Sequence, residues 1–154
     1  MLFPTFTFAA FFAVVLPVSW LVRSRPGAWK VTVLAASYVF YGYWNWRFLA
    51  LLAAMTVVNE VAAVAVHRSE GTLRGRLTAT AIAFDLGVLA LFKYYGFFVS
   101  SLEESFGWNG PALDIVLPVG VSFFTFQAMS YVIDIHRGDS TPAPLLDFAV
   151  YLSF

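Results

Sequence analysis

One stretch, Leu117 to Gly138, constrains the fold of this chain more than any other. It reads LPVGVSFFTFQAMSYVIDIHRG, which is apolar enough to lie in a membrane yet carries polar residues at helical spacing. A helix that begins at Pro118, where the missing N–H costs no hydrogen bond, turns by about 100° per residue. One narrow face then holds a set that we call the polar seam: Gly120, Phe123, Gln127, Ser130, Asp134 and Arg137. We expect the apolar back of this helix to contact lipid or protein, and the polar seam to face a bundle interior or an aqueous cavity.

The composition of the whole chain indicates an integral membrane protein. Of its 154 residues, 60% are hydrophobic and 12% are charged, whereas an average soluble domain has about 25% charged residues. So few charges cannot cover a surface that faces water, and we expect the lipid bilayer to be a direct partner. The net charge is zero, and without a large basic cluster nucleic-acid binding is not expected. The chain has no cysteine, which excludes disulfides, thiolate metal sites and an acyl-cysteine intermediate.

The apolar runs predict an all-α membrane fold with about five membrane helices and the start of another. The expected helices cover residues 3–22, 31–46, 48–66, 77–98, a fifth from Pro118, and a last apolar element from Leu145 to Phe154. The first run has no basic residues before it and is long enough to cross a bilayer, so we expect a retained helix that Pro17 kinks, not a cleaved signal.

The connecting segments predict an orientation in the membrane. Loops 23–30 and 67–76 hold six of the nine lysines and arginines, whereas the loop at 100–111 is acidic. Cytoplasmic loops carry an excess of basic residues, so both basic loops are expected in the cytoplasm and the N-terminus outside. The loop at 137–144 then falls on the cytoplasmic side, unless the segment after Pro118 is re-entrant.

Four segments of the chain resemble bacterial membrane-bound O-acyltransferases, the MBOAT family, in the branch that performs alginate O-acetylation. They are the N-terminal LFPTFTFAAFF, the aromatic block SYVFYGYWNWRFL from Ser37, FKYYGFF from Phe92, and the stretch from Leu117 to Gly138. The segments follow the order of the family and cover nearly the whole chain. The resemblance implies that residues 1–154 are the N-terminal portion of a longer multi-helix MBOAT bundle.

The resemblance also implies an activity. Members of this branch transfer an acyl group, expected here to be acetyl from cytoplasmic acetyl-CoA, toward an extracytoplasmic polysaccharide such as an alginate-like polymer or toward an extracytoplasmic acetyltransferase partner. Such a protein lies in the bacterial cytoplasmic (inner) membrane. The histidine that acts as base in the family lies downstream of the segments matched here, so we expect this chain alone to be inactive. The alternative is a non-catalytic membrane scaffold or a truncated remnant.

Three ionisable side chains inside the expected helices each allow a structural and a functional interpretation. Glu60, beside Asn59, and Asp85 are interpreted first as hydrogen-bond clamps between helices and second as reactive groups. Relatives in the family carry an amide near the position of Asp85, which argues against a catalytic carboxylate there. Lys93 is expected first to extend toward the membrane interface beside Tyr94 and Tyr95, with contact to a substrate carboxylate as the second interpretation.

Neither histidine is predicted to be catalytic. His67 lies in a basic loop and is expected to be solvated. His136 is chemically suited to act as a general base, but by the resemblance it occupies a position where relatives carry tyrosine.

The candidate site residues are therefore ones that would line a path for substrate. No catalytic residue, metal site or bound cofactor is predicted, because no metal-ligand cluster, phosphate loop or nucleophile motif is present in the sequence. Asp134 and Arg137, one turn apart, could pair with each other. The helix face together with the resemblance gives these substrate-tunnel candidates: Phe123, Gln127, Ser130, Tyr131, Asp134 and Arg137.

Overall fold

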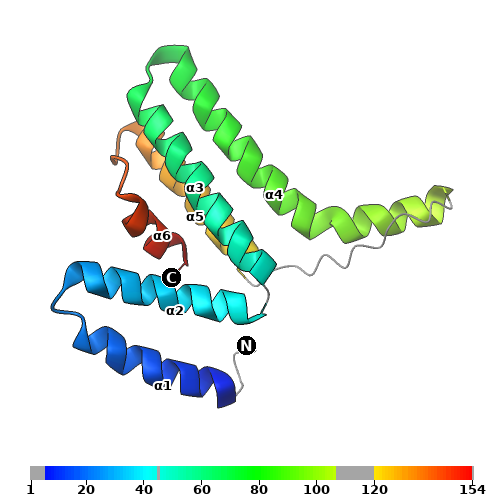
Figure 1. Ribbon diagram of the computed structural model, residues 1–154. Coiled ribbons are helices and arrows are strands. Elements are labelled where there is room, and N and C mark those ends of the chain that lie inside the picture. Colours follow the sequence, from blue (N-terminus) through cyan, green and yellow to red (C-terminus); the bar gives the residue numbers. More distant parts are fainter. Residues whose placement is uncertain (1–5, 45, 107–119, 154) are drawn as a thin grey trace.

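The structure, a computed structural model, describes residues 6–44, 46–106 and 120–153. All regular secondary structure in these ranges is helical, which confirms the predicted all-α class there (Figure 1). The helices are α1 (Phe6–Leu21), α2 (Pro26–Trp44), α3 (Trp46–Arg68), α4 (Gly71–Phe106), α5 (Val121–Arg137) and α6 (Leu145–Ser153).

Two of these helices are long and apolar enough to cross a membrane. They are α3 and the part of α4 from Gly71 to Tyr94, while α1 is a shorter apolar helix. The expected number of five membrane helices stays a prediction. In α1 the helix runs through Pro17 without a break.

Helix α3 lies at the centre of the bundle, where it packs against α2, α4, α5 and α6. Its buried residues recur every three or four positions, as expected for one side of a helix. They are Leu52, Met55, Thr56, Asn59, Glu60, Ala63 and Val66. Polar residues therefore lie on the same side as apolar ones, so each of them needs a partner inside the bundle.

The first connection is shorter than predicted. Helix α2 begins at Pro26, so Lys30, expected in a loop, lies in the second turn of α2. Proline is favoured at the first position of a helix because its fixed φ suits the helix and its missing N–H loses no bond there. Lys30 forms an ion pair with Asp147 of α6 (2.5 Å), which ties α2 to α6.

The basic loop predicted at 67–76 and the acidic loop predicted at 100–111 are also mostly helical. Only Ser69 and Glu70 separate α3 from α4, and α4 continues through Glu103 and Glu104 to Phe106. The loop predictions at these positions were wrong because charged residues were taken as breaks, although charge alone does not end a helix. Residues 107–111 of the predicted loop lie outside the described residues.

Helix α5 begins later than predicted. Gly120 has φ 83° and ψ 0°, in the left-handed region, so it precedes the helix, which begins at Val121. Pro118, the predicted start, lies outside the described residues. At the other end Gly138 has φ 86° and donates its N–H to Ile135 (3.1 Å), a common way for glycine to end a helix.

Helix α5 ends beside the α3–α4 turn. Figure 1 shows this turn at the top left of the view, and the α1–α2 turn at the lower left. Arg74 of α4 donates to the carbonyl of Ile135 (2.6 Å), which places the end of α5 beside the α3–α4 turn. Helix α5 therefore runs antiparallel to α4.

Candidate functional site

Helix α5 has two sides with different surroundings. Its buried residues are Val121, Phe124, Thr125, Ala128, Met129, Val132 and Ile135. They pack against α3, α4 and α6, in two clusters that include Leu52 and Phe148 at one end and Val66 and Ala81 at the other. The apolar back of α5 thus contacts protein, one of the two surroundings that the sequence allowed.

Tyr131 joins three parts of the bundle. Its hydroxyl donates to a carboxylate oxygen of Glu60 on α3 (2.9 Å) and accepts the backbone N–H of Ala143, which precedes α6 (2.8 Å). Its ring stacks on that of Phe148 in α6, with centroids 4.2 Å apart. The clamp predicted for Glu60 is confirmed, and Tyr131 is its partner.

A second polar pair joins α3 to α4. The side-chain amide of Asn59 donates to a carboxylate oxygen of Asp85 (2.8 Å) and also to the carbonyl of Met55 (3.1 Å). Both side chains are almost completely buried. The predicted clamp role of Asp85 is confirmed by this bond. The other oxygens, Asn59 Oδ1 and Asp85 Oδ2, are buried without a hydrogen-bond partner.

His136 lies at the α4–α5 contact, away from the polar seam. Its Nδ1 is 3.0 Å from the hydroxyl oxygen of Thr78, and that hydroxyl also donates to the carbonyl of Arg74 (2.9 Å). When His136 carries a proton on Nδ1, this N–H donates to the Thr78 oxygen. The hydroxyl proton of Thr78 then donates to the carbonyl of Arg74. His136 thus has a packing role at the end of α5, whereas His67 is exposed at the end of α3.

The polar seam points away from the packed core. Phe123 is 65% exposed, Ser130 and Arg137 are also exposed, and Asp134 is half-buried. Helical geometry puts these positions opposite the buried set of α5. The predicted ion pair between Asp134 and Arg137 is not formed.

Two of the candidate residues differ from the rest. Gln127 donates to the carbonyl of Tyr151 in α6 at 3.5 Å, while its Oε1 is buried without a partner. Tyr131 lies against α6, as described above. The structure therefore brings Phe123, Ser130, Asp134 and Arg137 to one outer side, and places Gln127 and Tyr131 at the border with α6.

This arrangement can bind polar groups, but it does not form a recognisable catalytic set. The seam offers a hydroxyl, a carboxylate and a guanidinium in sequence along one helix side. Within residues 6–44, 46–106 and 120–153, no three His, Cys, Asp or Glu side chains gather in a way that could hold a metal ion. The seam is a surface suited to contact substrate or further protein.

Two interactions were missed by reasoning from the sequence. Arg74 was assigned to a loop, yet it bonds to Ile135 across 61 positions of sequence. Glu60 and Tyr131 were each singled out, but their pairing was not foreseen. A bond from Arg74 to a helix end could be expected in general, because the last carbonyls of a helix attract a basic side chain. Nothing in the sequence, however, shows which helix end a distant arginine reaches.

Comparison with known proteins reveals clear relatives. The chain is 43% identical over 132 residues to a protein named probable alginate O-acetylase AlgI from Pseudomonas aeruginosa, covering 80% of this chain and 25% of that protein. It is 41% identical over 135 residues to the protein of the same name from Azotobacter vinelandii, with 80% and 26% covered. A peptidoglycan O-acetyltransferase from Helicobacter pylori is 28% identical over 116 residues, with 75% and 22% covered. The resemblance to the alginate O-acetylation branch is confirmed.

The similarity covers only part of each relative. The chain spans about a quarter of the length of the curated relatives that it matches. No family model matches the chain, and no solved structure matches it.

Proposed function

We propose that this chain, homologous to named O-acetylases over four fifths of its length, is a portion of a membrane-bound O-acyltransferase of the MBOAT family. Enzymes with this chemistry move an acetyl group from a donor to a hydroxyl oxygen. Acetyl-CoA in the cytoplasm is the proposed donor, and an extracytoplasmic polysaccharide related to alginate is the proposed acceptor, reached directly or through an extracytoplasmic acetyltransferase. The proposed location is the bacterial inner membrane, with the N-terminus outside.

The polar seam is the geometric observation that supports this proposal best. Its side chains lie opposite the packed core of α5, a helix that we propose to cross the membrane in the complete enzyme. A charged or polar group costs a few kcal/mol at the centre of a membrane helix unless it faces protein or water. We therefore propose that Ser130, Asp134 and Arg137 line the substrate path in the complete enzyme, with Phe123 and Gln127 at its border.

The buried clamps have a supporting role in this proposal. Tyr131 with Glu60, and Asn59 with Asp85, hold α5 and α4 against α3. The Tyr131–Glu60 bond restrains the rotation of α5 about its axis, and this rotation decides which side chains face the path. None of these four residues is proposed to touch the reacting atoms.

A scaffold without catalysis is the second candidate. It is favoured by the places of the two histidines, since His67 is exposed and His136 contacts Thr78 in the α4–α5 contact. Neither lies on the polar seam. In this case the seam would hold a partner protein and would not guide a substrate.

A segment exchange tests the two candidates. The matching segment of the Pseudomonas aeruginosa relative is replaced by this chain, and the chimera is expressed in a strain that lacks that relative. Restored O-acetylation of the secreted polymer supports the acyltransferase assignment, and Asp134→Asn is then expected to lower acetylation at least about tenfold, a loss of about 1.4 kcal/mol of transition-state stabilisation. A chimera that is present in the membrane at normal level without restoring acetylation contradicts the assignment and favours the scaffold.

A further inference from the structure

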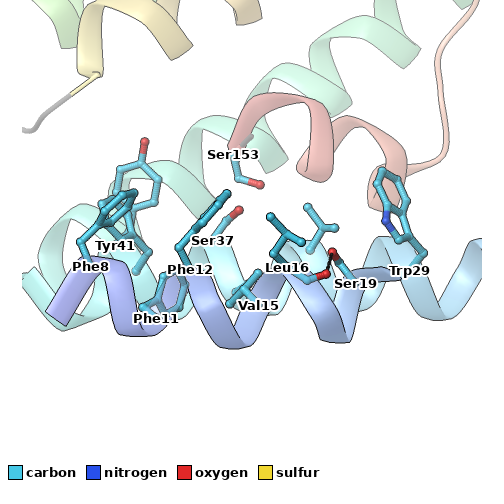
Figure 2. A pocket seen from close by; sticks show the side chains of 13 residues that line it. Phe8, Phe11, Phe12, Val15, Leu16, Ser19, Trp29, Ser37, Tyr41 and Ser153 are labelled. Atoms are coloured by element: carbon cyan, nitrogen blue, oxygen red, sulfur yellow. Dashed lines mark hydrogen bonds between the residues drawn. The ribbon is translucent and has the colours of Figure 1, made fainter. Parts of the chain in front are cut away.

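A long apolar groove lies between α1 and α2. Its volume is about 450 Å³, within the usual range for sites that hold small molecules. Figure 2 shows Phe8, Phe12 and Leu16 of α1 on one side, with Ser37 of α2 and Ser153 of α6 at its middle. Trp29 of α2 and Ser19 of α1 close the end nearest the α1–α2 turn.

The groove exists because α1 is packed on one side only. Among the described residues, α1 contacts α2 and has no buried residue of its own. Aromatic rings keep the two helices apart, with the centroids of Phe8 and Phe11 each 6.0 Å from that of Phe40. The space left between such rings is elongated and apolar, which suits an alkyl chain better than a compact polar molecule.

Basic side chains lie at one end of the groove. The α1–α2 turn carries Arg23 and Arg25, both exposed. Arg23 lies over the ring of Trp20, 5.8 Å from its centroid. Among the residues that the structure describes, neither arginine has an ion-pair partner, whereas Lys30 is already paired with Asp147. The turn therefore presents two guanidinium groups, with no carboxylate partner in the described part of the chain, beside the end closed by Trp29.

We propose that this groove binds a phospholipid with an anionic headgroup. One acyl chain lies along the rings between α1 and α2, and the phosphate lies at Arg23 and Arg25. Guanidinium groups recognise phosphate through paired N–H bonds, and tryptophan prefers the level of the headgroups. The charge at one end and the apolar length behind it together match this class of molecule. The proposal of a lipid site does not depend on the proposed acyl transfer.

The test measures lipid binding to the purified full chain by native mass spectrometry. The protein in mild detergent is titrated with phosphatidylglycerol or with phosphatidylcholine of the same acyl chains. Tighter binding of phosphatidylglycerol is expected, and Arg23→Gln with Arg25→Gln is expected to reduce this preference by about fivefold for each arginine. The matched control is Arg68→Gln with Arg76→Gln, which removes the same charge from exposed positions around the α3–α4 turn.

A second pair of variants tests the apolar part of the site. Val15→Trp fills the groove from α1, where no packed core is disturbed because α1 has no buried residue. It is expected to weaken binding of both lipids at least about fivefold. The control is Val14→Trp, at a neighbouring position that is 65% exposed and does not line the groove.

The control variants distinguish a specific lipid site from general electrostatic attraction of anionic lipid to the protein. Equal loss of preference in the two double-arginine variants would mean surface electrostatics only and would overturn the proposal. Equal binding by the Val15→Trp and Val14→Trp variants would overturn the assignment to this groove. Because the measurement involves no acetyl transfer, a failed segment exchange and a failed lipid titration are independent results.

Discussion

Buried polar residues of α3 hold the bundle together in pairs. Asn59 bonds to Asp85 in α4, and Glu60 bonds to Tyr131 in α5. Because Asn59 and Glu60 are adjacent on one helix, their side chains point in different directions. The two bonds therefore hold α4 and α5 on two different sides of α3. A hydrogen bond between membrane helices contributes about 1 kcal/mol, so the larger effect of these pairs is to fix which side of each helix faces inward.

Removing the hydroxyl of Tyr131 is expected to destabilise the fold while its packing remains. Tyr131→Phe keeps the ring stacked on Phe148 but leaves Glu60 buried without its donor and Ala143 N–H without its acceptor. The expected loss is about 1–2 kcal/mol, seen as a lower melting temperature in detergent by circular dichroism. Tyr151→Phe is the control, since Tyr151 is 48% exposed and its hydroxyl bonds to none of the described residues. Equal melting temperatures for the two variants would show that the bridge contributes nothing.

At position 85 an amide is expected to serve better than a carboxylate. Asn59 Oδ1 and Asp85 Oδ2 are both buried acceptors without a donor. Asp85→Asn keeps an oxygen for the amide of Asn59, adds a donor, and removes a charge from an apolar helix, so stability should stay the same or rise by up to about 1 kcal/mol. Asp85→Leu leaves Asn59 without a side-chain partner and should cost about 1–3 kcal/mol. Thermal unfolding of both variants checks this, and a larger loss for Asp85→Asn than for Asp85→Leu would refute it.

At the scale of helices, the end of α5 depends on a backbone conformation that glycine supplies. Gly138 has φ 86°, and a Cβ there would meet no atom within 4 Å, so substitution acts through backbone strain alone. Gly138→Ala is expected to destabilise by about 1 kcal/mol. Gly75 in α4 is equally open but helical, so Gly75→Ala should stabilise by about 0.5–1 kcal/mol. The two changes in melting temperature should therefore have opposite signs, and equal signs would contradict the role given to Gly138.

Sequence reasoning identified the helices more reliably than their ends and partners. The apolar period of residues 121–137 correctly separated a core side from the polar seam, because side-chain spacing in a helix is fixed by local geometry. The start of α2 at Pro26 and the extension of α4 to Phe106 were missed, since charged residues within the first or last turns of a helix look like loop residues in a sequence. The pairing of Glu60 with Tyr131 across 71 positions was not predictable, because it depends on how separate helices pack.

At the scale of the whole molecule, the two basic turns and the course of α5 bear on the orientation in the membrane. Arg23 and Arg25 lie in the α1–α2 turn, and Arg68 and Arg74 lie next to the α3–α4 turn (Figure 1). The bond from Arg74 to Ile135 brings the end of α5 beside the α3–α4 turn. If α5 were re-entrant, the chain would return to the side of the membrane from which it entered. The antiparallel course of α5 beside α4 argues against this.

Cysteine labelling in spheroplasts tests this orientation, and the chain suits it because it has no native cysteine. Single substitutions are made at four exposed positions: Thr7→Cys, Ser24→Cys, Glu70→Cys and Ser140→Cys. Basic turns remain in the cytoplasm during insertion, so a membrane-impermeant maleimide should label only the first variant until the membrane is opened, after which all four react. Labelling of Ser24→Cys and Glu70→Cys in intact spheroplasts would reverse the assigned orientation. Labelling of Ser140→Cys while those two stay protected would mean that α5 does not cross, and would remove the polar seam from the proposed substrate path.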